Sequence, residues 1–258
     1  MRPSGGRIHV TFRLPGGARR ALDARGIEYT ICEGPAGQPR KDLVNATSGC
    51  AALVTLLTNT VDADLMDAIG GQLKVVANLA VGFDNGSLDA AHSRGITVTN
   101  TPGVLDGASA GLTLALLVAP GRRVLEANRF LRSGAEWVWK PDLSVGLDIS
   151  SGATLRIVGL GRIGIAFARR AAAFDLTIIA TGSGAHSPEA SDLGAQAVGL
   201  AELLVKSDVV SLHCPVNSQT KSLPLPSRCG QGRSSVRAST FSSVSLRSTP
   251  NWCRRQML

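Results

Sequence analysis

The sequence predicts an α/β protein built on parallel sheets, and three observations carry this prediction. Short apolar segments alternate with helical segments through the first 100 residues and again after residue 150. The strongly apolar run 51–57 is typical of a strand that is buried on both faces of a parallel sheet. The segment 154–170, TLRIVGLGRIGIAFARR, has the pattern of a strand, a glycine-rich turn and a helix.

Strands and helices alternate regularly in the first part of the chain. Each of the expected helices ends at a glycine, Gly26, Gly70 or Gly95, which is the residue that most easily closes a helix. A loop rich in glycine and proline is expected at 33–40. The expected strands are 7–12, 27–32, 51–57, 74–77 and 96–99, and the expected helices are 18–25, 62–69 and 88–94.

The second part begins with a helical pattern over 104–131. Pro120 and Gly121 interrupt it, and a kink is expected there because proline removes one helical hydrogen bond and clashes with the preceding turn. A long connection, 133–149, precedes the glycine-rich turn. The remaining expected elements are a strand at 155–158, a helix at 165–173, a strand at 176–181, a short helix at 200–205 and a strand at 208–213.

The positive charge of the chain is concentrated at its end. The net charge is +8, and the 35 residues of 224–258 contain six arginines and no Asp, Glu or Lys, so they contribute +6 of it. The other 223 residues contribute only +2, which argues against a basic nucleic-acid-binding face on the folded body. The serine- and arginine-rich tail is expected to be disordered.

Composition also bears on the compartment of the protein. The five cysteines are scattered and form no CxxC pair, which favours reduced thiols over disulfides or a zinc site. No apolar run reaches the ~18 residues of a membrane span, and the N-terminus lacks the apolar region of a secretory signal. We therefore expect a cytoplasmic protein with no membrane partner and no metal.

The glycine-rich turn has the spacing of a dinucleotide site. Gly159 permits the tight reversal, Gly161 lets the main chain approach a pyrophosphate, and Gly164 lets the helix pack closely on the strand. The helix N-terminus then presents free N–H groups to the phosphates. We expect Arg162 and Ile163 to bind the cofactor with the three glycines, and the alternative is a purely structural strand-to-helix turn.

Five segments together resemble the D-isomer-specific 2-hydroxyacid dehydrogenases, most of all the glyoxylate/hydroxypyruvate reductase branch. The resemblance covers roughly residues 5–223 and implies an oxidoreductase with two flavodoxin- or Rossmann-like parallel-sheet domains. Residues 1–100 would be a substrate (lid) domain, and 101–223 the first half of an NAD(P)-binding domain that is incomplete. The segments are KVVANLAVGFDN (74–85), TNTPGVL (99–105), GRRVLEANRFLRSG (121–134), GLGRIG (159–164) and SDVVSLHCPVNSQTKSL (207–223).

The resemblance implies roles for residues outside the glycine turn. The main-chain N–H groups of Val81 and Gly82 would hold the carboxylate of a small 2-oxo or 2-hydroxy acid, as oriented main-chain donors suit an anion. The Thr113 hydroxyl would face the cofactor phosphates. An ordinary loop at 81–82, and a threonine bonded to its own helix at 113, remain the alternatives.

The resemblance also implies a role for His213, Cys214 and Pro215. This segment would lie along the cofactor and contact it mainly through main-chain atoms. Taken alone, His213 at a strand end could be a base or a ligand. No carboxylate or second ligand lies near it in sequence, so a structural role is favoured for this histidine. Cys214 is likewise expected to be a packed thiol.

The expected ribose site is Thr181, Gly182 and Ser183, about 20 residues after the glycine turn. An acid at this place accepts hydrogen bonds from the ribose 2′-hydroxyl of NAD and repels a 2′-phosphate. Because no acid is present, NADP is permitted as well as NAD. Relatives that prefer NADP often have an arginine where this chain has Ser183.

No catalytic residue is assigned from the sequence. The family uses an Arg, a Glu and a His that follow the third strand of the cofactor domain, and the resemblance stops at Leu223. We therefore expect this chain to be inactive, with a changed reading frame after Leu223. A catalytically silent NAD(P)-binding or regulatory module and a basic-tailed nucleic-acid binder are the alternatives. The family forms homodimers, which the interruption at Pro120 and Gly121 puts in doubt here.

Overall fold

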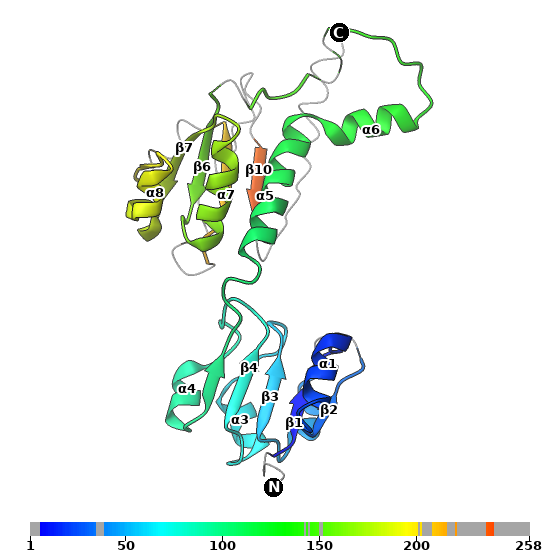
Figure 1. Ribbon diagram of the computed structural model, residues 1–258, viewed down its shortest axis with the longest axis vertical. Coiled ribbons are helices and arrows are strands. Elements are labelled where there is room, and N and C mark those ends of the chain that lie inside the picture. The colour runs from blue at the N-terminus through cyan, green and yellow to red at the C-terminus, as the bar shows by residue number, and fades with distance from the viewer. Residues whose placement is uncertain are drawn as a thin grey trace. The chain divides into compact units, whose positions relative to one another are not determined.

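The computed structural model describes residues 6–34, 39–141, 143, 145–149, 152–200, 202, 208–215, 220 and 236–239. The chain divides into two compact units, Met1–Val104 and Leu105–Leu258. Each unit holds one five-stranded sheet in which every described strand pair is parallel (Figure 1). The predicted fold class, α/β with two parallel sheets, is confirmed.

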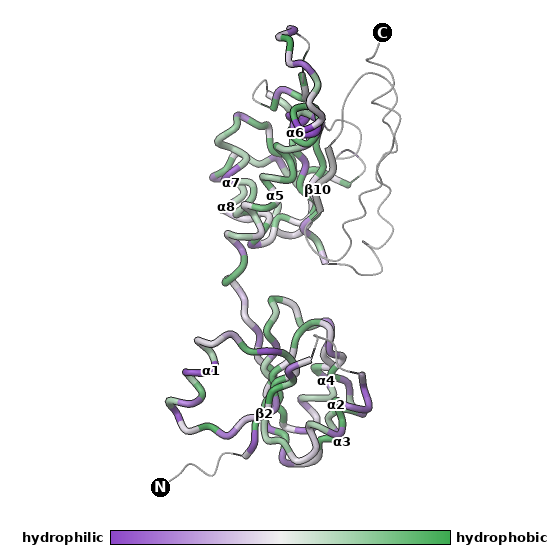
Figure 2. Tube along the Cα trace, turned by 90° about the vertical axis from the view of Figure 1, so that its right-hand side faces the viewer, coloured by the Kyte–Doolittle hydropathy of each residue, from purple (hydrophilic) through white to green (hydrophobic). Residues whose placement is uncertain are grey.

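The first sheet has the strand order β2-β1-β3-β4-β5. Its strands are β1 (Ile8–Val10), β2 (Tyr29–Ile31), β3 (Ala52–Thr55), β4 (Val75–Asn78) and β5 (Thr97–Thr99). Its helices are α1 (Gly16–Asp23), α2 (Arg40–Thr47), α3 (Ala63–Ile69) and α4 (Leu88–Ser93). In Figure 2, α1 lies on one side of this sheet and α2, α3 and α4 lie on the other.

The core of the first unit lies between the sheet and α2, α3 and α4. Leu53 of β3 and Val76 of β4 point into it from paired positions of the sheet, and Leu65 of α3 meets them there; all three are buried. The Asp62 side chain accepts a hydrogen bond from the Leu65 N–H and so begins α3, as a side-chain cap does.

Helix α2 was not predicted. It begins after Pro39 without a side-chain cap, and its buried residues are Leu43 and Thr47. Two buried positions are too few to produce a helical hydrophobic pattern. Packing of Leu43 into the core of the first unit therefore decides this helix, which local sequence does not.

The second sheet has the strand order β10-β9-β6-β7-β8. Its strands are β6 (Thr154–Val158), β7 (Thr177–Thr181), β8 (Gln196–Ala197), β9 (Val209–Leu212) and β10 (Val236–Ser239). Its helical elements are α5 (Asp106–Gly121), α6 (Val124–Arg132), α7 (Arg162–Ala172), the 3-10 helix η1 (Ser183–His186) and α8 (Pro188–Asp192).

Strands β8 and β10 were not predicted. The tail 224–258 was expected to be disordered, but its segment Val236–Ser239 pairs in parallel with β9. Such pairing uses main-chain N–H and C=O groups at the edge of β9, so it requires little of the side-chain pattern. The rest of that tail, and most of the expected helix 200–205, lie outside the described residues.

The expected kink in the long helix is present as a break. Helices α5 and α6 are bent by 62° relative to each other. Pro120 still lies within α5, and the chain turns at Arg123, whose φ of 53° is left-handed. Arg122 and Arg123 donate their N–H groups to the carbonyl oxygens of Val118 and Pro120, which closes α5 directly after the proline. Among the described residues, no single helix is long and apolar enough to span a membrane, and only the bent pair passes that test.

Candidate functional site

The glycine-rich turn joins β6 to α7 as predicted, and two of its glycines are required by close main-chain contacts. Gly159 has a φ of +93°, and a Cβ there would lie 2.7 Å from the Cys214 nitrogen. A Cβ on Gly164 would lie 2.5 Å from the Gly159 carbonyl oxygen. Both glycines are therefore structurally obligatory, because real Cβ atoms do not make such contacts.

Gly161 differs from the other two glycines. It is exposed, has no heavy atom within 4 Å of its Cβ position, and immediately precedes α7. Its φ of −81° is one that any residue adopts, so neither the backbone nor packing requires glycine there. The N–H groups of Arg162, Ile163 and Gly164, the first residues of α7, have no intrahelical acceptor. Together these features form an open approach to a helix N-terminus, where anions bind.

The expected ribose residues lie next to this turn. The Gly159 N–H donates to the Thr181 carbonyl oxygen at 3.0 Å, and the Cβ position of Gly182 is 3.6 Å from the Gly159 Cα. Gly182 has a φ of +103°, which explains the absence of an acid at this residue, since side chains rarely adopt that conformation. Ser183 is exposed and begins η1.

His213, Cys214 and Pro215 follow β9 and approach the turn from the other side. The His213 N–H donates to the Val158 carbonyl oxygen at 2.8 Å, and its Nε2 lies 2.8 Å from the Ser211 hydroxyl. The imidazole packs on the Phe167 ring, with 5.3 Å between centroids. Burial lowers the pKa of His213 to about 4, so the ring is neutral at physiological pH. These contacts favour the structural role for His213. Burial raises the pKa of the neighbouring Cys214 thiol.

Thr113 is fully buried in α5, and its hydroxyl donates to the Ser109 carbonyl oxygen at 2.9 Å. This is the helix-bonded alternative that the sequence left open. The donor of this side chain is therefore already used within its own helix. A role for Thr113 at the cofactor phosphates stays a prediction.

In the first unit, the loop after β4 carries Val81 and Gly82. Asparagine side chains donate to the carbonyl oxygens of both residues. Asn100 Nδ2 donates to Val81 O at 2.8 Å, and Asn78 Nδ2 donates to Gly82 O at 3.0 Å. Among the described residues, the N–H groups of Val81 and Gly82 have no hydrogen-bond partner. Adjacent main-chain donors left open in this way can accept an anion.

Sequence reasoning missed the side chains that hold this loop. Asn78 also donates to Asn85 Oδ1 at 3.0 Å, and Asn85 Nδ2 donates to the Asn59 carbonyl oxygen at 2.9 Å. Asn59 Oδ1 in turn accepts from the Thr11 hydroxyl at 2.6 Å. Thr11 follows β1 and Asn59 follows β3, whereas Asn78 ends β4 and Asn85 lies in the loop after it. The available signal was an asparagine directly after an apolar strand, but its partners could be identified only from the fold.

An ion pair at the glycine turn was also missed. Arg162 Nε lies 3.7 Å from Asp106 Oδ2, and the other oxygen of Asp106 is buried without a hydrogen-bond partner among the described residues. Asp106 is the first residue of α5. Helices α5 and α7 pack together on the face of the sheet that carries Leu155 and Ile157, which brings these two side chains together.

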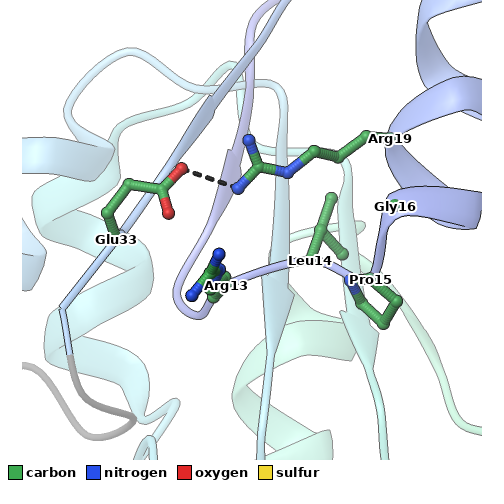
Figure 3. A pocket seen from close by; sticks show the side chains of 6 residues that line it. All are labelled: Arg13, Leu14, Pro15, Gly16, Arg19 and Glu33. Carbon is green, nitrogen blue, oxygen red and sulfur yellow. Dashed lines mark hydrogen bonds and ion pairs between the residues drawn. The ribbon is translucent and has the colours of Figure 1, made fainter.

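A separate open pocket of about 610 Å³ lies in the first unit at the ends of β1 and β2. Figure 3 shows Arg19 reaching across it to Glu33, with 2.6 Å between Nη2 and Oε1. Arg13 lines the same pocket. The side chains of Arg19 and Glu33 are 35% and 60% exposed, so this is a surface ion pair of small energetic value.

Comparison with known proteins agrees with the geometry of the glycine turn. Residues 114–226 match the family described as "D-isomer specific 2-hydroxyacid dehydrogenase, NAD binding domain". The chain is 40% identical over 216 residues to a glyoxylate reductase of Korarchaeum cryptofilum, covering 83% of this chain and 64% of that protein. The chain belongs to the D-isomer-specific 2-hydroxyacid dehydrogenase family. Residues 114–226 therefore belong to the NAD-binding domain of this family.

Two further similar proteins are matched over the same part of their length. A glyoxylate reductase of Thermococcus kodakarensis is 43% identical over 227 residues, covering 86% of this chain and 66% of that protein. A crystal structure of a protein from Thermus thermophilus superposes with a TM-score of 0.76 at 42% identity, covering 83% of this chain and 66% of that chain. The chain thus spans about two thirds of the length of these relatives.

Proposed function

We propose that this chain binds NAD(P) at its glycine turn and the carboxylate of a small 2-oxo acid at the loop of Val81 and Gly82. The observation that carries the proposal is the pair of open main-chain donor sites. One is the N-terminus of α7 beside the unobstructed Gly161, and the other is formed by the N–H groups of Val81 and Gly82. Each suits an anion, a pyrophosphate at the first and a carboxylate at the second.

Different residues of the turn would contribute to cofactor binding in different ways. Gly161 leaves room for the pyrophosphate, the N–H groups of Arg162, Ile163 and Gly164 donate to it, and the Arg162 guanidinium adds a positive charge. Ser183 would lie beside the adenosine ribose. When bound, the nicotinamide supplies or accepts a hydride, which is the chemistry of the family.

Both NAD and NADP fit the ribose site. Gly182 carries no side chain that could repel a 2′-phosphate, and its left-handed φ disfavours an acid there. The exposed Ser183 is neutral, so no guanidinium at that position selects NADP. We infer that NADP(H) binds at least as tightly as NAD(H).

We further propose that the 258-residue chain binds these ligands without turning over 2-oxo acids. Proton transfer to a carbonyl oxygen needs an acid whose pKa lies near the working pH. His213 lies beside the glycine turn, with its carbonyl carbon 2.8 Å from the Cβ position of Gly159, but its pKa of about 4 leaves it without a proton to give. Its ring is also engaged by Ser211 and Phe167. This supports the silent-binding alternative over activity.

Fluorescence titration of the full chain with NADPH and NADH tests the binding. Gly161→Val would fill the open approach and should weaken binding at least tenfold, while Gly199→Ala, also at an unobstructed glycine, should leave binding unchanged. Unchanged binding by Gly161→Val would contradict the proposed site. Glyoxylate- or hydroxypyruvate-dependent oxidation of NADPH above background would contradict the proposed inactivity.

We also propose that the second unit associates with a second copy through the apolar surface of α6 and the segment that follows it. Exposed side chains there include Leu125, Leu131, Trp137 and Trp139, with exposures of 56% to 69%. Several large apolar side chains exposed along one stretch of the chain favour an interaction site there. Leu125→Glu should lower the mass found by light scattering, whereas Leu57→Glu in the first unit should not. Equal masses for both variants would contradict this interface.

A further inference from the structure

Asp106 is an acid placed beside a site that must receive an anion. Its Oδ2 lies 3.7 Å from Nε of Arg162, which is the first residue of α7 and directly follows Gly161. The distance is that of a loose ion pair, longer than a hydrogen bond. The carboxylate is therefore close to the α7 N-terminus, where the proposed function places the pyrophosphate.

The two partners differ in exposure. The Asp106 side chain is 18% exposed and is fixed at the start of α5, which packs along α7. The Arg162 side chain is 61% exposed. The first turn of α7 contains no acid. Among the described residues, Asp106 is the acid that forms an ion pair with Arg162. Arg162 can leave the pair, whereas Asp106 cannot leave the site.

The second oxygen of Asp106 shows that the carboxylate is not fully accommodated. Oδ1 is buried and has no hydrogen-bond partner among the described residues. Arg170 is another cation near the start of α5, with Nη2 3.6 Å from the Cβ position of Gly107, but its Nη1 donates to the Ala166 carbonyl oxygen. The guanidinium of Arg162 is thus an important source of compensation for the Asp106 charge.

We propose that Asp106 is a positioning residue that sets the affinity of the dinucleotide site by competing with the cofactor phosphates for Arg162. This inference rests on the proposed function. Binding of the pyrophosphate draws Arg162 from Asp106 and leaves the carboxylate facing two phosphate charges without its partner. The acid therefore weakens binding of NAD and NADP alike, and it does so through a charge that salt can screen.

The test is a set of NADPH titrations of the full chain at low salt and at 0.5 M NaCl. Asp106→Asn keeps the size of the side chain and removes its charge, so binding should tighten about tenfold at low salt and by less than about threefold at high salt. Glu126→Gln is the matched control, because Glu126 also lies in the first turn of a helix of the same unit. Glu126 lies beyond the far end of the 16-residue α5, so Glu126→Gln should leave the affinity for NADPH unchanged.

The competition for Arg162 is tested by a double-variant cycle. Arg162→Gln alone should weaken binding, and the gain from Asp106→Asn should be smaller in the Arg162→Gln background than in the wild type. An equal gain in both backgrounds, or no gain in the wild type, would overturn the proposal while dinucleotide binding itself stands. Absence of NADPH and NADH binding by every variant would overturn both this inference and the proposed function.

Discussion

The Cβ position of Gly164 lies 2.5 Å from the carbonyl oxygen of Gly159, so the two ends of the glycine-rich turn are in direct main-chain contact. A side chain at Gly164 would disrupt this contact, so Gly164 is needed for the stability of the turn as well as for cofactor binding. Gly161, between them, has free space around it. The same motif therefore contains glycines that serve different purposes, and variants can separate them.

Gly164→Ala should destabilise the second unit by about 1–3 kcal/mol, because the added methyl group must displace the main chain of the turn. Gly161→Ala should change the free energy of unfolding by less than about 0.5 kcal/mol but weaken NADPH binding. Urea denaturation and fluorescence titration measure the two effects. Equal losses of stability in both variants would show that this distinction is wrong.

Substitutions of Ser183 should move the cofactor preference in opposite directions. Ser183→Arg adds a partner for a 2′-phosphate and should favour NADPH about tenfold, since charge-assisted hydrogen bonds contribute ~1.5–3 kcal/mol. Ser183→Asp should repel the phosphate and favour NADH. Gly182 is unsuitable for this experiment because its φ of +103° would strain any side chain. The measurement is the ratio of dissociation constants, and an unchanged ratio in both variants would place the ribose elsewhere.

His213 should make the stability of the second unit depend on pH. Burial lowers its pKa from 6.5 to about 4, so the unfolded chain takes up a proton before the folded chain does. Stability from this group is therefore complete above pH 6.5 and is lost as the pH falls from 6.5 to 4. The loss should be roughly 3 kcal/mol, at ~1.4 kcal/mol per pKa unit.

The measurement is the free energy of unfolding from pH 7.5 to 4 for the wild type and for His213→Gln. The variant should show a flatter profile, whereas His92→Gln, at an exposed residue of the first unit, should follow the wild type. A His213→Gln profile parallel to that of the wild type would mean that the imidazole protonates without cost.

Arg156 should be replaceable with a gain in stability. It lies in β6 with no exposed surface, and its three guanidinium nitrogens have no hydrogen-bond partner among the described residues. Burial lowers the pKa of Arg156, against the opposing effect of Asp208 and Glu202, which shows that its charge is poorly solvated there.

Arg156→Leu should therefore raise the free energy of unfolding by about 1–3 kcal/mol, because it removes buried donors that have no partner among the described residues. Arg169→Leu, at an exposed residue of α7, should change it by less than about 0.5 kcal/mol. The midpoint of urea denaturation checks both. A lower midpoint for Arg156→Leu would indicate that the guanidinium has a stabilising partner.

The sequence by itself determined the elements whose signals are local. The glycine turn, the run 51–57 and the helix expected at 62–69 each depend on residues that are neighbours along the chain. Apolar spacing and turn residues act over these short distances, so the parallel α/β class and the β6–α7 turn could be predicted. Helix α2 and strand β10 could not, because packing on the core and pairing with an open strand edge produce them.

Only the tertiary structure decided what the candidate sites are made of. Asn59 meets Asn78 and Asn85 because the parallel strands β3 and β4 end at the same edge of the sheet. Asp106 reaches Arg162, 56 positions later in the chain, because α5 and α7 pack together. The state of His213 also depends on burial against Phe167 rather than on any charge close to it in sequence. Contacts between residues so far apart leave no periodic signal, so folding alone brings these groups together.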